Sequence, residues 1–496
     1  MKKILVALSV VTVAVAAIAG VMVWRASKFG ATRDANPVVT LAEPPSVDID
    51  TAAEMLGAVI RIESVTRLAG DPQPGADEPW LELRALLEAR YPRVFALPTD
   101  VVAGHTLLVT WPGSDESLPP MILMAHQDVV PINEGTEADW THGPFRGAVA
   151  DGYVWGRGAM DDKGALIAIL EAAESLASAG WTPRRTIILL FGHDEEVGGR
   201  GAAESFTLLA SRGVAPVMVL DEGLAILARL PFTGKPAALI GVTEKGTASL
   251  LLTVQTAGGH SSRPPRESGA VRVARAIVAL EDHQMPAHLS AAPFPEMMEA
   301  LAPDLPFAAR LAFANRDLLG RLIESRLTDP SANAIVRTTT APTMLSGSIK
   351  DNVLPQRASA VVNFRIHPND TIDEVIEHAS QVTRHVQGLT ISPYRDGIAA
   401  APSPVSSTRS ETYRVLEAVA REAAGAGVPV APALMIGATD ARHAVALSRD
   451  AIYRFVPAVY GDEDLEGFHG TNERLSVENL GRMIRAYAQL MMALGG

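Results

Sequence analysis

Helical and strand patterns alternate along the first half of the chain. Apolar residues recur at helical spacing in residues 50–65, 79–91 and 163–179, and Gly180 closes the last of these stretches. Short apolar runs with strand character lie between or after them, in residues 105–110, 121–125, 186–191 and 217–220. We therefore predict an α/β fold in which helices cover both faces of a central sheet.

A different pattern begins near Glu244. Residues 249–255 and 358–365 alternate apolar and polar positions, as half-buried strands do. A helical stretch follows each of these strands, at residues 267–281 and 371–386. The order strand, helix, strand, helix predicts a small α+β domain.

The small domain is expected to interrupt a larger one. Helical spacing resumes after it in two stretches, 410–425 and 477–494. We therefore assign residues 244–400 to the small domain, with a long helical insert at 285–340, and residues 47–243 and 401–496 to the larger domain.

The N-terminus carries a separate apolar pattern. Lysines precede an uninterrupted apolar run at residues 4–24, and Arg25 and Lys28 follow it. A run of this length can cross the roughly 30 Å of a bilayer, and an N-terminal signal segment shares several of its features. We expect residues 1–28 to be a membrane anchor or a signal segment, followed by a polar, proline-containing linker at 29–46. Either alternative implies an exported protein, membrane-anchored or periplasmic.

Composition narrows the chemistry. The net charge of −13 argues against a nucleic-acid partner, because no basic surface is available to cover a phosphate backbone. The chain has no cysteine, which excludes disulfides, thiol nucleophiles and cysteine metal sites. Any metal must therefore be held by histidine and carboxylate side chains.

Such side chains gather where the predicted strands end. They follow three of the apolar runs and precede one helix: His126 with Asp128, Glu195 with Glu196, Asp221, and Asp161. Ligands of open α/β sheets bind beyond the carboxyl ends of the strands. Histidine with carboxylates suits zinc, while cobalt or manganese would also fit, and several carboxylates with few histidines suggest two ions that share a ligand.

The segments around these residues resemble the aminoacylase, carboxypeptidase S and acetylornithine deacetylase family of dinuclear zinc metallopeptidases. The resemblance runs from about Ile60 to the C-terminus, and the long helical insert resembles the branch of carboxypeptidase S and N-fatty-acyl-amino-acid hydrolases. It rests on four motifs: residues 126–128 (His-Gln-Asp), 156–164, 194–196 (Asp-Glu-Glu) and 221–223 (Asp-Glu-Gly). The resemblance implies a zinc exopeptidase-like catalytic domain, with a mixed central sheet flanked by helices, and an inserted α+β lid or dimerisation domain.

The resemblance also implies a set of metal ligands. They are His126, Asp161, Glu196, Asp221 and His469. His126 and Asp221 would bind one zinc, Glu196 and His469 the other, and Asp161 would bridge the two. A cis peptide bond is implied between Asp161 and Asp162.

Three further residues are implied to act in catalysis. Asp128 would orient His126 through its second ring nitrogen. Glu195 would be the general base that takes a proton from the attacking water and hands it to the leaving amine. His260 would stabilise the oxyanion of the tetrahedral intermediate, and in relatives it can reach the site of a neighbouring subunit, so a homodimer is a possible assembly.

The substrate side of the site is also drawn from the resemblance. Five residues match family positions that bind substrate: Asn352, Arg365, Thr439, Asp440 and Arg442. An arginine fork suits recognition of a carboxylate, although both arginines also suit purely structural ion pairs. The expected activity is hydrolysis of the amide bond of short peptides or N-acyl amino acids, with release of a free amino acid.

Alternative interpretations remain for individual residues and for the whole chain. We expect His193 to be structural and Arg157 to hold the loop that carries Asp161. A non-catalytic, membrane-tethered binding module on the same fold would lack a ligand or the base, and none is missing. A two-metal phosphodiesterase would need a basic phosphate pocket, and no such pocket is evident.

Overall fold

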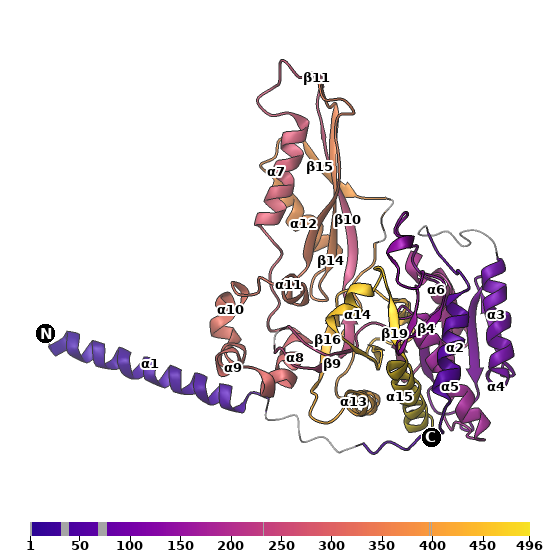
Figure 1. The fold of residues 1–496 in the computed structure, drawn as a ribbon. Coiled ribbons are helices and arrows are strands. Elements are labelled where there is room, and N and C mark those ends of the chain that lie inside the picture. The colour runs from indigo at the N-terminus through magenta and orange to yellow at the C-terminus, as the bar shows by residue number, and fades with distance from the viewer. Residues whose placement is uncertain (1, 31–38, 68–76, 232, 396, 398) are drawn as a thin grey trace.

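The computed structural model describes residues 2–30, 39–67, 77–231, 233–395, 397 and 399–496 (Figure 1). The middle of the predicted linker, residues 31–38, lies outside the described residues. In Figure 1 the large sheet with its helices lies on the right, the small sheet rises above it, and the N-terminal helix projects to the left.

A ten-stranded mixed sheet forms the centre of the larger unit, in the order β1-β2-β6-β3-β7-β17-β9-β8-β18, with β16 beside β9. Its strands are β1 (Thr99–Val102), β2 (Thr106–Trp111), β3 (Met121–His126), β6 (Ile187–Gly192), β7 (Met218–Asp221), β8 (Ile226–Leu227), β9 (Ala237–Glu244), β16 (Val430–Met435), β17 (Ile452–Arg454) and β18 (Val459–Tyr460). β3 runs parallel to both β6 and β7. The carboxyl ends of these three strands therefore meet at one edge.

Helices cover both faces of this sheet, as the alternating pattern predicts. They are α2 (Ile49–Ile60), α3 (Glu78–Arg90), α4 (Pro92–Phe95), α5 (Lys163–Ser178), α6 (Arg200–Ser211), α13 (Glu411–Ala424), α14 (Asp462–Gly467) and α15 (Val477–Gly495). Alternate residues of β3 serve opposite cores: Leu123 packs with α2, α5 and α15, whereas Ile122 packs with α6. Burial on both faces explains why β3 and β6 are continuous apolar runs.

A second, four-stranded antiparallel sheet has the order β12-β14-β10-β15. Its elements are β10 (Gly246–Gln255), α7 (Gly269–Asp282), β12 (Thr339–Ser346), β14 (Arg357–Ile366), α12 (Ile372–Thr383) and β15 (Leu389–Pro393). Leu250 and Leu252 face the helices, while Thr247 and Ser249 face the other way. Only Lys245 separates β9 of the large sheet from β10 of the small one.

Smaller elements complete the fold. A three-stranded sheet contains β4 (Ala148–Ala150), β5 (Tyr153–Trp155) and β19 (Arg474–Ser476), and a short ribbon at the tip of the small unit contains β11 (Gly259–His260) and β13 (Val353–Leu354). The helical insert contains α8 (Phe294–Leu301), α9 (Phe307–Ala314), α10 (Arg316–Glu324) and α11 (Pro330–Val336). Its core reaches Ala431 and Ala433 of β16.

The N-terminal helix α1 (Lys2–Lys28) is one long element. Its stretch Ser9–Lys28 is long and apolar enough to cross a membrane, and it is almost wholly exposed. A signal sequence near the N-terminus has the same properties.

The structure corrects some predicted boundaries. The helix predicted at 50–65 ends at Ile60, because the following segment is extended: Ser64 donates a hydrogen bond to the Gln127 carbonyl, and Val65 forms a bridge with Val129. The helix predicted at 371–386 ends at Thr383. Several strands were not predicted from the pattern, among them β9, β12 and β16.

Candidate metal centre

The chemistry-bearing residues converge at the carboxyl edge of the parallel strands. His126 ends β3, Glu195 and Glu196 form the turn after β6, and Glu222 directly follows β7. A cavity of about 510 Å³ opens at this edge, and its wall includes Asp161, Glu195, Glu196, Glu222 and His469. The prediction that strand ends would gather the donors therefore holds for their placement.

Asp161 lies between the two histidines. Its Oδ1 is 2.9 Å from Nε2 of His126, and its Oδ2 is 2.7 Å from Nε2 of His469. Nε2 of His469 also lies 3.4 Å from Oε1 of Glu196. One carboxylate thus faces an imidazole nitrogen with each of its oxygens, which is the placement a ligand shared by two ions requires.

A buried ion pair holds the loop that carries Asp161. Oε1 of Glu473 accepts hydrogen bonds from the backbone N–H groups of Gly158, Met160 and Asp161. Its Oε2 accepts a hydrogen bond of 2.6 Å from Arg157. The peptide bond between Asp161 and Asp162 is cis, as predicted. Arg157 has the structural role expected of it, whereas the role of Glu473 was not anticipated.

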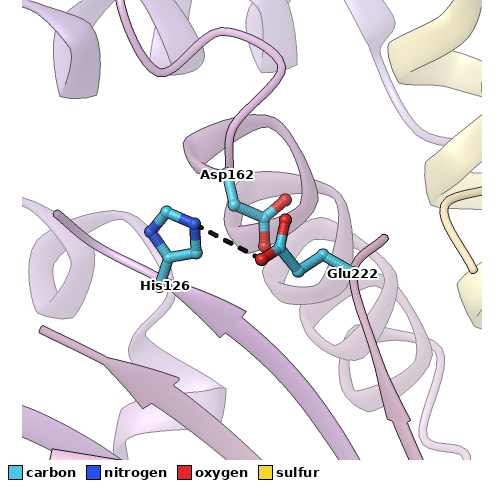
Figure 2. Close-up of side chains that lie close together, drawn as sticks. All are labelled: His126, Asp162 and Glu222. Carbon is cyan, nitrogen blue, oxygen red and sulfur yellow. Dashed lines mark ion pairs between the residues drawn. The ribbon is translucent and has the colours of Figure 1, made fainter. Parts of the chain in front are cut away.

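The structure differs from the sequence analysis at the end of β7. Both carboxylate oxygens of Asp221 accept backbone N–H groups, Oδ1 from Glu222 at 3.0 Å and Oδ2 from Ala441 at 2.7 Å. The next side chain, Glu222, faces the site instead, with Oε1 3.8 Å from Nε2 of His126 (Figure 2). Successive side chains of a strand point to opposite sides, so a difference of one residue decides which carboxylate reaches the site. The adjacent Glu in the Asp-Glu-Gly motif was the available signal.

Asp128 connects His126 to the turn that contains Glu195 and Glu196. Nδ1 of His126 lies 3.0 Å from the Asp128 carbonyl oxygen and 3.3 Å from its carboxylate, which leaves Nε2 directed at Asp161. The Asp128 carboxylate also accepts the backbone N–H groups of Glu195 and Glu196, each at 3.1 Å. It therefore orients the imidazole and the turn together.

Burial and charge shift the titration of this cluster. Although burial opposes it, hydrogen bonds from His126 and His469 hold the pKa of Asp161 below its usual range. The hydrogen bond with Asp161, reinforced by Glu196, raises the pKa of His469 to about 10. Burial, and then the charge of Asp440, raises the pKa of Glu195 well above its ordinary value. Burial and the charge of Asp161 do the same for Glu222.

The donor set fits divalent cations. Asp161, Glu196 and Glu222 crowd around two imidazoles, and repulsion among them raises the pKa of Glu196 and Glu222 beyond the effect of burial. The Asp162 carboxylate faces Glu222 and His126, is fully buried, and has no hydrogen-bond partner among the described residues (Figure 2). A buried excess of negative charge with oxygen and imidazole donors is stabilised by a metal ion.

Three basic side chains also line the cavity. They are Lys245, Arg365 and Arg442. Arg365 lies beside Asn363 on the polar face of the small sheet, where it is paired with Thr247 of β10. Nη1 of Arg442 lies 3.7 Å from Oε1 of Glu195. Lys245 was not singled out from the sequence, although its place between two strand patterns marks the junction of the two sheets.

Two predicted substrate residues are buried beneath the cavity and do not line it. Thr439 donates a hydrogen bond of 2.8 Å from Oγ1 to Glu244. Asp440 is buried against Gly192 and Gly199, on either side of the turn that contains Glu195 and Glu196. Both residues pack inward and support the segment from which Arg442 reaches the cavity.

His260 and Asn352 lie apart from the carboxylate cluster. Both line a separate hollow at the tip of the small unit, beside the ribbon of β11 and β13. Within one chain the structure does not bring them to Asp161, in contrast with the roles expected for them. The long β10 and β14 strands carry that tip away from the large sheet.

His193 is structural, as expected. Its Nδ1 is 2.7 Å from the hydroxyl of Thr106, and its ring contacts Trp80 and His105. Burial lowers the pKa of His193.

Two histidines and several carboxylates lie beside a cavity at the carboxyl edge of an α/β sheet. This arrangement is typical of the active sites of metal-dependent hydrolases. The profile of Peptidase family M20/M25/M40 matches residues 122–493. The chain belongs to this family, and it is a hydrolase of amide bonds. Members of the family are metal-dependent. The alternative of a non-catalytic binding module is thereby set aside.

Two relatives illustrate the similarity. Probable carboxypeptidase S-like 2 of Dictyostelium discoideum is 35% identical over 474 residues, which cover 92% of this chain and 88% of that protein. N-fatty-acyl-amino acid synthase/hydrolase PM20D1 of Xenopus tropicalis is 36% identical over 469 residues, with the same two coverages of 92% and 88%. Both confirm the family resemblance drawn from the four motifs.

Solved structures share the fold. The M20 family metallo-carboxypeptidase Sso-CP2 from Sulfolobus solfataricus superimposes with a TM-score of 0.67 at 18% identity, covering 90% of this chain and 99% of that one. Human carnosine dipeptidase 1 gives 0.59 at 15% identity, covering 90% and 97%. The predicted fold class, a mixed sheet flanked by helices, is confirmed.

Proposed function

We propose that the chain binds two divalent ions, zinc in the simplest case, and releases a free amino acid from short peptides or N-acyl amino acids. The observation that carries the proposal is the position of Asp161, with one oxygen at His126 and the other at His469. In this proposal His126, Asp161 and Glu222 hold one ion, and His469, Asp161 and Glu196 hold the other. Glu222 replaces Asp221, whose oxygens are already occupied by backbone N–H groups.

Bound divalent ions would polarise the scissile carbonyl and lower the pKa of the attacking water. Glu195 then acts as general base and passes the proton to the leaving nitrogen. Its raised pKa suits it to hold the proton between the two transfers. Asp128 fixes the backbone of the turn that presents Glu195, and Arg442 lies close enough to direct its carboxylate.

A cationic side chain in the cavity supports a substrate with a free carboxylate. Nζ of Lys245 already donates hydrogen bonds to the carbonyls of Ala334 and Arg337, so Arg365, which also lines the cavity, would bind the carboxylate of a leaving amino acid. The names of the relatives agree in this respect, because a carboxypeptidase and an N-fatty-acyl-amino acid hydrolase both release an amino acid with a free carboxylate.

Three further elements of the proposal concern assembly and location. The small unit acts as a lid or a dimerisation unit, and His260 and Asn352 complete the site through closure or from a second copy. The exposed apolar helix α1 supports an exported protein that α1 either anchors to the membrane or directs as a signal.

The test is hydrolysis by the full chain, purified in detergent and loaded with zinc, of dipeptides, N-acetyl amino acids and N-oleoyl amino acids. We expect release of free amino acid that a chelator abolishes and added metal restores. The preferred acyl group would identify the substrate class. Absence of turnover on the whole panel, with two metal equivalents bound per chain, would contradict the proposal.

A further inference from the structure

The last turns of α1 pack against the helical insert. Ala26 is completely buried there, and α1 lies beside α9. The side chain of Asn315, at the junction of α9 and α10, donates one hydrogen bond of 3.1 Å to the Met22 carbonyl and another of 2.8 Å to the Leu311 carbonyl. This buried amide fixes the height of the two short helices along α1.

The contact with Met22 places the junction of α9 and α10 beside the C-terminal end of the apolar stretch Ser9–Lys28. Met22 lies six residues before Lys28, which corresponds to about 9 Å along a helix. Trp24, Arg25 and Lys28 have the side chains that mark the boundary between hydrocarbon and headgroups. If α1 crosses a bilayer, the helices beside Met22 enter the interfacial layer of that bilayer, which such helices penetrate by about 5–10 Å.

The exposed surface of this hairpin, residues 307–324, carries large apolar side chains. Phe307, Leu318 and Leu322 are 49%, 64% and 52% exposed. Leu318 and Leu322 are four residues apart, so they form one stripe on α10. Within the described part of the chain, these leucine side chains pack into no hydrophobic core. Their apolar area is therefore exposed to water unless another surface covers it.

Arginines border the same surface. Residues 307–327 contain four, at positions 310, 316, 321 and 326, against the two acidic residues Asp317 and Glu324, in a chain whose net charge is −13. The guanidinium of Arg310 lies 5.9 Å from the centre of the Phe307 ring. Apolar side chains bordered by arginines are typical of helices that lie at an anionic lipid interface.

We propose that the α9–α10 hairpin is a second membrane contact. It inserts Phe307, Leu318 and Leu322 into the headgroup layer beside α1, while its arginines face anionic phospholipid headgroups. The proposal rests on the part of the proposed function in which α1 remains attached as an anchor. The insert that contains the hairpin also contacts the cavity, because Lys245 donates hydrogen bonds to the carbonyls of Ala334 and Arg337 at the end of α11.

The absence of cysteine from the chain allows a direct test. Leu318→Cys and Leu322→Cys, in the full chain, are each labelled with an environment-sensitive nitrobenzoxadiazole dye and reconstituted into vesicles of phosphatidylcholine and phosphatidylglycerol. The matched control is Leu81→Cys, which is 57% exposed on α3, at the opposite side of the molecule from α1 (Figure 1). We expect blue-shifted emission and quenching by doxyl-labelled lipid at 318 and 322, and quenching by aqueous iodide alone at 81.

Equal quenching profiles at positions 318 and 81 would overturn the proposal. An emission shift that depends on the protein-to-lipid ratio and is insensitive to lipid quencher would assign the surface to a second copy, and would overturn it too. The double variant Arg321→Gln with Arg326→Gln should weaken quenching at 318 only when phosphatidylglycerol is present. Hydrolysis of a water-soluble N-acetyl amino acid, measured on the same samples, keeps failure of the proposed function distinguishable from failure of the membrane contact.

Discussion

Asp221 and Glu222 are neighbours in the chain, yet their carboxylates meet different partners. The Asp221 carboxylate accepts hydrogen bonds from the backbone N–H groups of Glu222 and Ala441, and so connects β7 to the segment after β16. Glu222 extends past it towards His126. At the residue scale, the backbone groups that need an acceptor nearby therefore decide which of the two carboxylates faces the cavity.

This difference predicts a specific pattern of metal content. If the chain binds two ions as proposed, Glu222→Gln should lose one of them, because an amide cannot replace a charged oxygen donor, whereas Glu195→Gln should keep both ions and lose about 10²–10⁴-fold in kcat. Metal analysis of the dialysed proteins, with kcat on the best panel substrate, measures both effects. Asp221→Asn with one ion missing, beside a fully loaded Glu222→Gln, would instead favour Asp221 as the ligand.

At the scale of elements, the loop before α5 depends on a residue from the far end of the chain. Glu473 precedes β19 and satisfies three backbone N–H groups of that loop while it pairs with Arg157. Both partners are buried, so no water replaces a missing acceptor.

We expect Glu473→Gln to reduce the free energy of unfolding by about 3–5 kcal/mol, because it leaves a buried guanidinium unpaired. Glu463→Gln is the control, since Glu463 pairs with Arg474 at 3.1 Å on the surface and such pairs contribute about 1 kcal/mol or less. Urea unfolding of both variants measures the difference. Losses of the same size in the two variants would argue against a supporting role for Glu473.

The strands that carry the site could be predicted from the sequence, together with several of the longer helices. The strands β3, β6 and β7 were recognised within a residue or two, because burial on both faces makes them continuous apolar runs. Helix α2 was predicted too long, because Ser64 and Val65 bond to a distant segment instead of continuing the helix. Strand β12 was missed, since its exposed, irregular face carries no clear alternation and Pro342 accompanies a bulge.

At the scale of the whole molecule, the small sheet contacts the helical insert through the buried side chain of His367. His367 follows β14, its ring is stacked 4.7 Å from that of His288, and its Nδ1 accepts the N–H of Asn369. Burial, and then the charge of His288, lowers the pKa of His367 to about 3. The folded protein therefore holds this side chain neutral.

The sign of the resulting pH dependence follows from linkage. Unfolded His367 takes up its proton near pH 6.5, whereas the folded form does not until about pH 3, so stability present above pH 6.5 is lost as the pH falls between these values. We expect a slope of up to about 1.4 kcal/mol per pH unit from this group.

Urea unfolding at pH 7 and pH 5 measures this slope. His367→Gln should lose less stability between the two pH values than the parent protein, whereas His385→Gln, at an exposed position, should behave like the parent. An unchanged pH dependence in His367→Gln would show that other groups control acid stability.

The sequence by itself determined the α/β class, the inserted second sheet and the donors at the strand ends, because these depend on local periodicity and on residues adjacent in the chain. Only the tertiary structure decided that Glu222 faces the site in place of Asp221, and that His260 and Asn352 lie at a distant tip. It also decided that α1 rests on the hairpin of the insert. These outcomes depend on which segments pack together across hundreds of residues, and no local pattern encodes that packing.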